Sequence, residues 1–174
     1  EDVQEFLLRS AHQNSGESFF QALARFLAQR LGMAFVCIDH LEGDELAVRT
    51  LAMHFDGKFE DNVAYALKDT PCGEVVGQTM CCFPRDVRHL FPKDAVLQKM
   101  RAESYVGTTL WSFDGKPIGL IAVIGRKPLA TSRHAESVLK LVAVPAAGEL
   151  ERMLAEEALR RAHDELELRV KERT

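Results

Sequence analysis

The sequence predicts an α+β fold: an antiparallel central sheet with helices on one side, followed by a long coiled-coil-like helix. Three observations support this prediction. An amphipathic helical pattern lies near the start, two pairs of apolar runs are each joined by a short turn, and a charged helical pattern closes the chain. Two hairpins connected by an irregular segment form one antiparallel sheet, and the helices are then segregated from the strands.

The N-terminal part predicts two helices. Residues 1–13 have a mostly helical pattern, which we interpret as a connector helix that Asn14-Ser15-Gly16 breaks. Glu17–Leu31 has the sequence ESFFQALARFLAQRL and repeats Phe and Leu at helical spacing. Gly32 follows, at the position where glycine commonly ends a helix.

Four strands are predicted, joined in pairs as hairpins. Met33–Leu41 is an apolar, partly β-branched run, and Glu45–Phe55 returns after a turn that contains glycine. Ser104–Phe113 and Pro117–Arg126 form the second pair. Asp114-Gly115 between them indicates a hairpin, because glycine readily adopts the positive φ that such turns require.

The connection between the hairpins, Asp56–Glu103, is irregular and rich in turn residues. Pro71 and Pro92 are each expected at the first position of a short helix, where the missing amide would have no partner anyway. A connection of this length within a compact domain is usually functional. We therefore expect the binding site in this segment.

The C-terminal helix is predicted from Ser132 onward, and Pro145 should kink or interrupt it. From Glu149 to Thr174 the pattern is charged apart from a narrow apolar stripe. Such a helix is marginal alone in water, so a second copy is its expected partner. This predicts a homodimer through the N- and C-terminal helices, with a helix docked on its own domain as the alternative. Because the chain ends within this pattern, we expect an input module of a longer protein.

Composition argues against several classes of protein. The net charge is −4 and basic residues are interspersed with acidic ones, which argues against a nucleic-acid partner. No apolar run approaches the roughly 20 residues of a membrane span, so no membrane contact is expected. The cysteines Cys37, Cys72, Cys81 and Cys82 form no C-x-x-C pair, and we expect reduced thiols in a cytoplasmic protein.

Several stretches carry a family resemblance and together span nearly the whole domain in the family's order. They are LAMHFDG (Leu51–Gly57), YALKDTPCGEVV (Tyr65–Val76), a Phe-Pro followed by LFPKD (Phe83–Asp94), AESYVGTTL (Ala102–Leu110), DGKPIGLIAVIGRKPL (Asp114–Leu129) and AAGELER (Ala146–Arg152). The arrangement resembles a GAF domain of bacterial sensor proteins, from the branch found ahead of histidine kinase, PAS or diguanylate cyclase regions.

The resemblance implies a GAF/PAS-like architecture, with a six-stranded or similar sheet and a ligand pocket roofed by the middle connection. It assigns residues 1–15 to a connector helix, 16–148 to the GAF sensory domain and 149–174 to a signalling helix. The ligand and any cofactor stay unknown, because GAF domains hold cyclic nucleotides, bilins, haem, oxo-acids or nothing.

Thr70-Pro71-Cys72 is the most specific local motif. Pro71 fixes a helix start, so Thr70 can cap it and Cys72 lies in the first turn, where the helix dipole favours a thiolate. Cys72 is thus a candidate ligand-binding or redox thiol, and Cys81 or Cys82 could pair with it. The alternative is that Cys72 is a small buried residue and Thr70 only a cap. Cys37 is expected to be plain core.

Two further pairs are candidate ligand contacts. Tyr105 and Trp111 flank a strand that relatives place beside the pocket, and they share a face if the strand is regular. They would form an aromatic wall, or else ordinary core. Phe91 and Asp94 lie near the expected roof helix, where Asp94 would cap the helix or meet a polar ligand.

We interpret the chain as a non-enzymatic sensory module that binds a small molecule and relays its occupancy through a dimeric C-terminal helix to an output domain. The alternatives are a ligand-free dimerisation scaffold and a thiol-redox sensor that uses Cys72. Catalytic residues are not expected, because no catalytic motif is recognisable. No metal site is expected either, because the histidines are scattered and paired cysteine spacing is missing.

Overall fold

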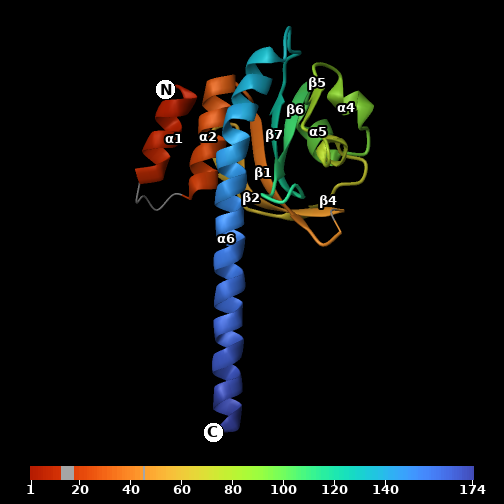
Figure 1. Ribbon diagram of the computed structural model, residues 1–174. Helices are drawn as coiled ribbons and strands as arrows, with labels where there is room; N and C mark the ends of the chain where they lie inside the picture. The colour runs from red at the N-terminus through yellow and green to blue at the C-terminus, as the bar shows by residue number, and fades with distance from the viewer. Residues whose placement is uncertain (13–17, 45) are drawn as a thin grey trace.

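The computed structural model describes residues 1–12, 18–44 and 46–174, and a seven-stranded antiparallel sheet organises them (Figure 1). The helices are α1 (Val3–His12), α2 (Phe19–Leu31), α3 (Pro71–Val75), α4 (Val87–Leu90), α5 (Ala95–Met100) and α6 (Arg133–Arg173). The strands are β1 (Phe35–Glu42), β2 (Ala47–Phe55), β3 (Lys58–Glu60), β4 (Ala64–Ala66), β5 (Met80–Phe83), β6 (Ser104–Trp111) and β7 (Pro117–Gly125). The predicted break at Asn14-Ser15-Gly16 lies outside the described residues.

The sheet places the two predicted hairpins side by side. Its order is β3-β2-β1-β7-β6-β5, and β4 also pairs with β2. The pairing of β1 with β2 and of β6 with β7 confirms both hairpins, and β1 pairs with β7 between them. The middle connection adds the short strands β3, β4 and β5, which the sequence patterns did not predict.

Local signals fix both ends of α2. The Ser18 side chain accepts a hydrogen bond from the Gln21 backbone amide, and the Gln21 side chain accepts one from the Ser18 amide. Such a capping box satisfies amides that have no partner within the helix. Gly32 follows with φ of 65°, which confirms the predicted glycine C-cap.

The long helices α1, α2 and α6 lie together on one face of the sheet, as expected (Figure 1). Their core with the sheet contains fully buried side chains, among them Phe6, Leu27, Val106 and Leu139. The short helices and the middle connection cover the opposite face, over a second core that includes Val75, Leu97 and Leu120. The sheet therefore separates a face of long helices from a face of short, irregular segments.

The helix α6 is continuous from Arg133 to Arg173, with Pro145 inside it, so the predicted interruption is wrong. Proline has no amide to bond to the carbonyl of Leu141, one turn earlier. Leu141 lies on an exposed part of the helix, where its carbonyl can be hydrated. The lost bond therefore does not require the helix to end there.

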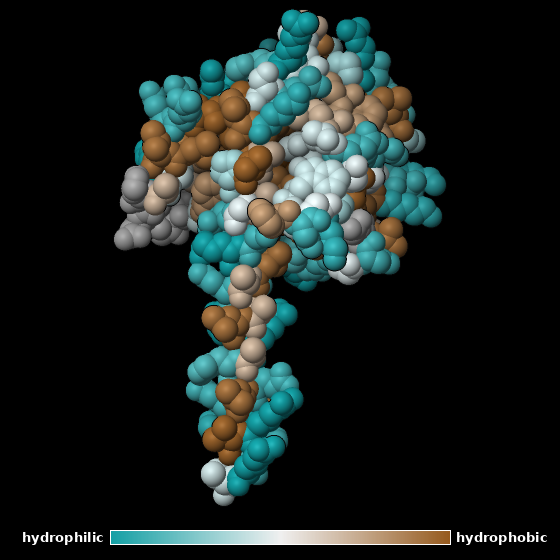
Figure 2. Space-filling view, in the orientation of Figure 1, coloured by the Kyte–Doolittle hydropathy of each residue, from teal (hydrophilic) through white to brown (hydrophobic). Residues whose placement is uncertain are grey.

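Beyond Leu154, α6 projects away from the domain (Figure 1). Figure 2 shows apolar side chains along this projecting part, where Leu159, Leu166 and Val170 are each more than half exposed. Among the described helices, none combines the length and apolar character needed to cross a membrane.

The prediction that Pro92 is the first residue of a short helix is wrong. The helix α5 begins at Ala95, and the Asp94 carboxylate accepts hydrogen bonds from the amides of Val96 and Leu97. A carboxylate that satisfies two amides defines the N-cap, so Pro92 lies before the helix.

Candidate functional site

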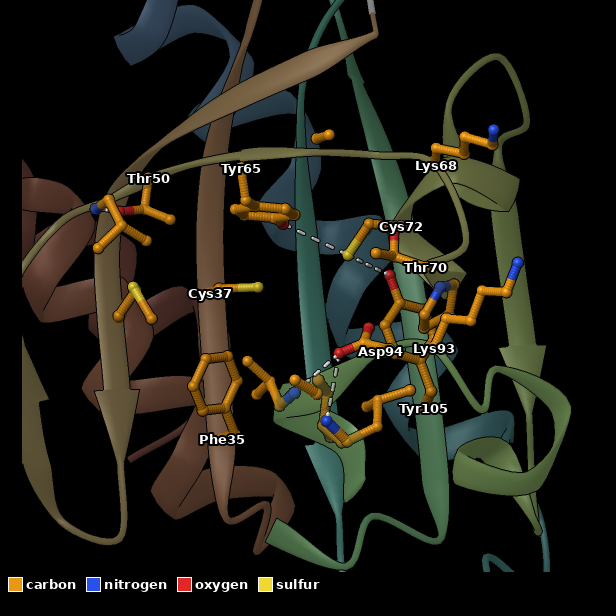
Figure 3. Close-up of a pocket in the computed structure, with 18 residues that line it drawn as sticks. Phe35, Cys37, Thr50, Tyr65, Lys68, Thr70, Cys72, Lys93, Asp94 and Tyr105 are labelled. Atoms are coloured by element: carbon orange, nitrogen blue, oxygen red, sulfur yellow. Dashed lines mark hydrogen bonds between the residues drawn. The ribbon is translucent and has the colours of Figure 1, made fainter. Parts of the chain in front are cut away.

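A pocket of about 310 Å³ lies between the sheet and the middle connection, as the resemblance implied (Figure 3). Strands β1, β2, β4, β6 and β7 contribute to its walls together with α3 and α5. The lining residues are Phe35, Cys37, Thr50, Met53, Val63, Tyr65, Ala66, Lys68, Thr70, Pro71, Cys72, Lys93, Asp94, Ala95, Val96, Leu97, Tyr105 and Ile124. Of the predicted site residues, Thr70, Cys72, Asp94 and Tyr105 meet here.

The first turn of α3 holds Cys72 in this pocket. Thr70 Oγ1 accepts a hydrogen bond from the Gly73 amide at 3.3 Å and donates to the Leu67 carbonyl at 2.7 Å, which confirms Thr70 as the N-cap. A Cβ at Gly73 would lie 2.6 Å from the Leu67 carbonyl oxygen, so only glycine allows this close turn. The turn fixes the direction of the Cys72 side chain, which is buried.

Four side chains surround the Cys72 sulfur. The Tyr105 hydroxyl donates to Cys72 Sγ at 3.0 Å. The Tyr65 hydroxyl donates to Asp39 Oδ2 at 2.5 Å and lies 3.5 Å from Cys72 Sγ. The sulfur of Cys37, the sulfur of Cys72 and a carboxylate oxygen of Asp39 lie within 4.8 Å of one another.

Burial controls the protonation of this cluster. It raises the pKa of Asp39 to about 7, against the opposing effects of the Tyr65 hydrogen bond and of the neighbouring Cys37 thiol. The hydrogen bond with Cys72, followed by burial, raises the pKa of Cys37 well above its ordinary value. Burial likewise raises the pKa of Tyr65 and Tyr105. At neutral pH the Cys37 thiol is therefore protonated, and the Asp39 carboxyl is close to its midpoint.

Charged groups from two loops also line the pocket. Lys68 and Lys93 are exposed, and Asp94 lies beside Lys93 (Figure 3). Burial raises the pKa of Asp94, although its bonds to the α5 amides oppose this. The capping role predicted for Asp94 is thus confirmed, and its contact with a ligand stays a prediction.

The other two predicted site residues lie outside this pocket. Phe91 packs edge-on against Phe83, with ring centres 5.2 Å apart. Trp111 lines a separate groove with Phe113, beside the α6 residues Val144 and Ala147. Trp111 is the last residue of β6, next to a shift in the pairing with β7, and it lines the groove beside α6 rather than the pocket that Tyr105 lines.

Sequence reasoning missed Cys37, Asp39 and Tyr65. Cys37 is buried as expected, but it also lines the pocket. A carboxylate two residues after a cysteine, within an apolar strand, was the available signal, since alternation places both side chains on one face. Their proximity to Cys72 depends on the path of the middle connection, which the sequence pattern does not describe.

The fold resembles several solved domains. The GAF domain of an Acinetobacter phosphoenolpyruvate-protein phosphotransferase has a TM-score of 0.70 at 15% identity, over 89% of this chain and 94% of that one. A phycocyanobilin-bound GAF domain from a cyanobacterial phytochrome gives 0.64 at 15% identity, over 88% and 93%. Residues 122 to 287 of a methyl-accepting chemotaxis protein give 0.62 at 18% identity, over 87% and 97%.

No curated protein matches the sequence. The family model of the GAF domain matches residues 15–150, which is most of the chain. This match covers the sheet, the pocket and α6 as far as Leu150. The chain belongs to the GAF domain family.

Proposed function

We propose that this GAF domain is a non-enzymatic sensor that binds a small molecule and relays occupancy through a dimeric α6 to an output domain, a histidine kinase or a diguanylate cyclase. The supporting observation is a chain of direct contacts from the pocket cluster to α6. A Cβ at Gly119 of β7 would lie 2.4 Å from the Asp39 carbonyl oxygen and 3.0 Å from Leu150 Cδ2. Strand β1, strand β7 and α6 therefore meet without free space at the point where α6 leaves the domain.

Through this contact, a ligand bound in the pocket could change the position of α6. A ligand that displaces Cys37 or Tyr65 would also act on β1, because Cys37 belongs to that strand and Tyr65 bonds to Asp39 of the same strand. Packed interfaces tend to switch between discrete arrangements rather than deform gradually. A ligand that prefers one arrangement then shifts the population of α6 positions.

The pocket volume favours a sensor over a ligand-free scaffold. A cavity of about 310 Å³ reaches the range of small-molecule sites. Its walls are mostly apolar, with Lys68 and Lys93 available to a polar or anionic group. One of the similar structures carries phycocyanobilin, which shows that this fold can hold a small molecule on another sequence.

The proposed dimer covers the apolar residues of α6. Leu159, Leu166 and Val170 are exposed at helical spacing, whereas intrahelical ion pairs such as Arg152–Glu156 support the charged faces. A second α6 would bury this stripe, as in a coiled coil. We expect the purified chain to be a dimer by native mass spectrometry and the double variant Leu159→Glu, Leu166→Glu to be a monomer. Leu168→Glu, which places a charge on the opposite, exposed face of the same helix, should stay dimeric.

Ligand binding is tested by closing the pocket. Val63 lines the pocket and is 45% exposed, so Val63→Trp can fill the opening with little disturbance of the core. The matched control is Leu90→Trp, since Leu90 is 58% exposed and is not a lining residue. Thermal shift against fractionated cell extract should detect a stabilising fraction for the unmodified chain and for Leu90→Trp, but not for Val63→Trp.

The relay requires the full-length parent protein. Addition of the stabilising fraction should change kinase or cyclase activity, and Val63→Trp should abolish that response. Binding without any change in output activity would support the ligand pocket and contradict the proposed relay. Equal stabilisation of Val63→Trp would assign the ligand to another part of the surface.

A further inference from the structure

The cluster formed by Cys37, Asp39 and Cys72 has the composition and spacing of a metal site. We propose that it binds one thiophilic divalent cation of the Zn²⁺ class at the inner end of the pocket. This inference concerns a cofactor of the pocket and stands whether or not α6 relays a signal. Thiolate and carboxylate ligands are both common for Zn²⁺.

The three side chains are already close enough to share an ion. Their ligand atoms lie within 4.8 Å of one another. Tetrahedral coordination with Zn–S bonds of about 2.3 Å places two sulfurs about 3.8 Å apart, so the cluster needs only small side-chain movements. Cys37 and Asp39 alternate on β1, and the capped turn at Thr70 holds Cys72, so secondary structure positions all three.

A buried carboxylate oxygen gives independent support. Asp39 is fully buried, and its Oδ1 atom has no hydrogen-bond partner among residues 1–12, 18–44 and 46–174. Buried polar atoms without a partner are rare because desolvation is not compensated. A cation bound to this oxygen and to two thiolates would supply the missing interaction.

The surrounding hydrogen bonds suit a metal site. Tyr65 donates to Asp39 Oδ2, which leaves Oδ1 as the ligand, and Tyr105 donates to Cys72 Sγ. Such outer-shell donors orient ligands and are a regular feature of metal sites. Cys37 and Cys72 both line the pocket, so the fourth coordination position would face the cavity and be open to water or a sensed molecule. Binding displaces the two thiol protons: Zn²⁺ replaces 2 H⁺ and forms two Zn–S bonds.

The experiment uses the chain stripped with a chelator under reducing conditions and titrated with Zn²⁺, with native mass spectrometry as the readout. We expect one tightly bound ion per chain, retained by the matched control Cys81→Ser, Cys82→Ser. Tyr65→Phe should weaken binding by about 10–100-fold, the usual effect of removing an outer-shell partner. Cys37→Ser and Cys72→Ser should weaken it further. His163→Ala is a second control, because His163, Asp164 and Glu167 form an exposed cluster that could bind metal.

A second measurement uses the unmodified chain, so its result does not depend on whether the variants fold. Zn²⁺ should protect Cys37 and Cys72 from alkylation and leave Cys81 and Cys82 reactive, as resolved by peptide mass spectrometry. Co²⁺ in place of Zn²⁺ should give thiolate-to-metal absorption, which a carboxylate-only site lacks. The proposal is overturned if the chain binds no stoichiometric ion, if His163→Ala removes the binding, or if Cys37 and Cys72 are instead isolated as a disulfide. Loss of relay with retained Zn²⁺ binding would count only against the sensor function.

Discussion

The two faces of the sheet differ in what they bury. On the α6 face, Val106, Leu110 and Leu139 are fully buried in an apolar core. On the pocket face, apolar residues such as Leu97 and Ile124 surround a cavity and a polar cluster. Close packing stabilises a fold, whereas a cavity with buried polar groups lowers stability and allows binding. We therefore expect substitutions on the α6 face to lower stability more than substitutions on the pocket face.

Truncation of one leucine on each face gives the largest expected effect. Leu110→Ala should cost about 2–5 kcal/mol, because it leaves a void in an apolar core with long helices on it. Leu97→Ala should cost less, since Leu97 borders an existing cavity and lies on the short helix α5, which can move inward. Urea unfolding measures both values, and an equal or larger loss for Leu97→Ala would contradict the comparison.

The Asp39 carboxyl should make the pocket face sensitive to pH in metal-free protein. Its pKa is about 7 when folded and 3.8 when unfolded, so the folded state holds more protons between these values. The protonated Asp39 therefore contributes to the free energy of unfolding below about pH 4. This contribution, at most about 4 kcal/mol, is lost as the pH rises to about 7. Asp39→Asn mimics the protonated form and should remove this fall, although Cys37, Cys72 and Tyr65 still surround the site.

Urea unfolding of both proteins between pH 4 and pH 8, with chelator present, checks this prediction. The stability difference between the two proteins should change up to about pH 7 and then level off. A difference that is constant with pH would show that Asp39 is ionised in the folded chain throughout. On the α6 face, Leu110→Ala serves as the control, because it should shift the whole profile without changing its shape.

The same contrast explains what could be predicted from the sequence. Both hairpins, the C-cap of α2 and the helix α6 follow from local signals, namely alternation, Gly32 and helical spacing. The cap at Thr70 was predictable for the same reason. The cluster was not, because Cys37 and Cys72 are brought together by the fold of the connection, and β3 to β5 are too short for a clear pattern. Trp111 was misplaced because it lies at the end of β6, where the strand pattern does not show against which element its ring packs.

Removal of the Thr70 cap of α3 should cause the smallest loss of stability among these variants. Its effect on the reactivity of the Cys72 thiol should be direct. Thr70→Ala removes the hydroxyl that bonds to Gly73 and Leu67, and should cost about 1 kcal/mol. Cys72 lies in that turn, so its alkylation in metal-free protein should become faster, whereas Thr70→Ser should keep both bonds and the slow rate. Alkylation kinetics resolved by peptide separate Cys72 from Cys81, whose rate should not change. Faster reaction at every cysteine would indicate general unfolding, and an unchanged Cys72 rate would mean that the sheet, rather than the capped turn, shields this thiol.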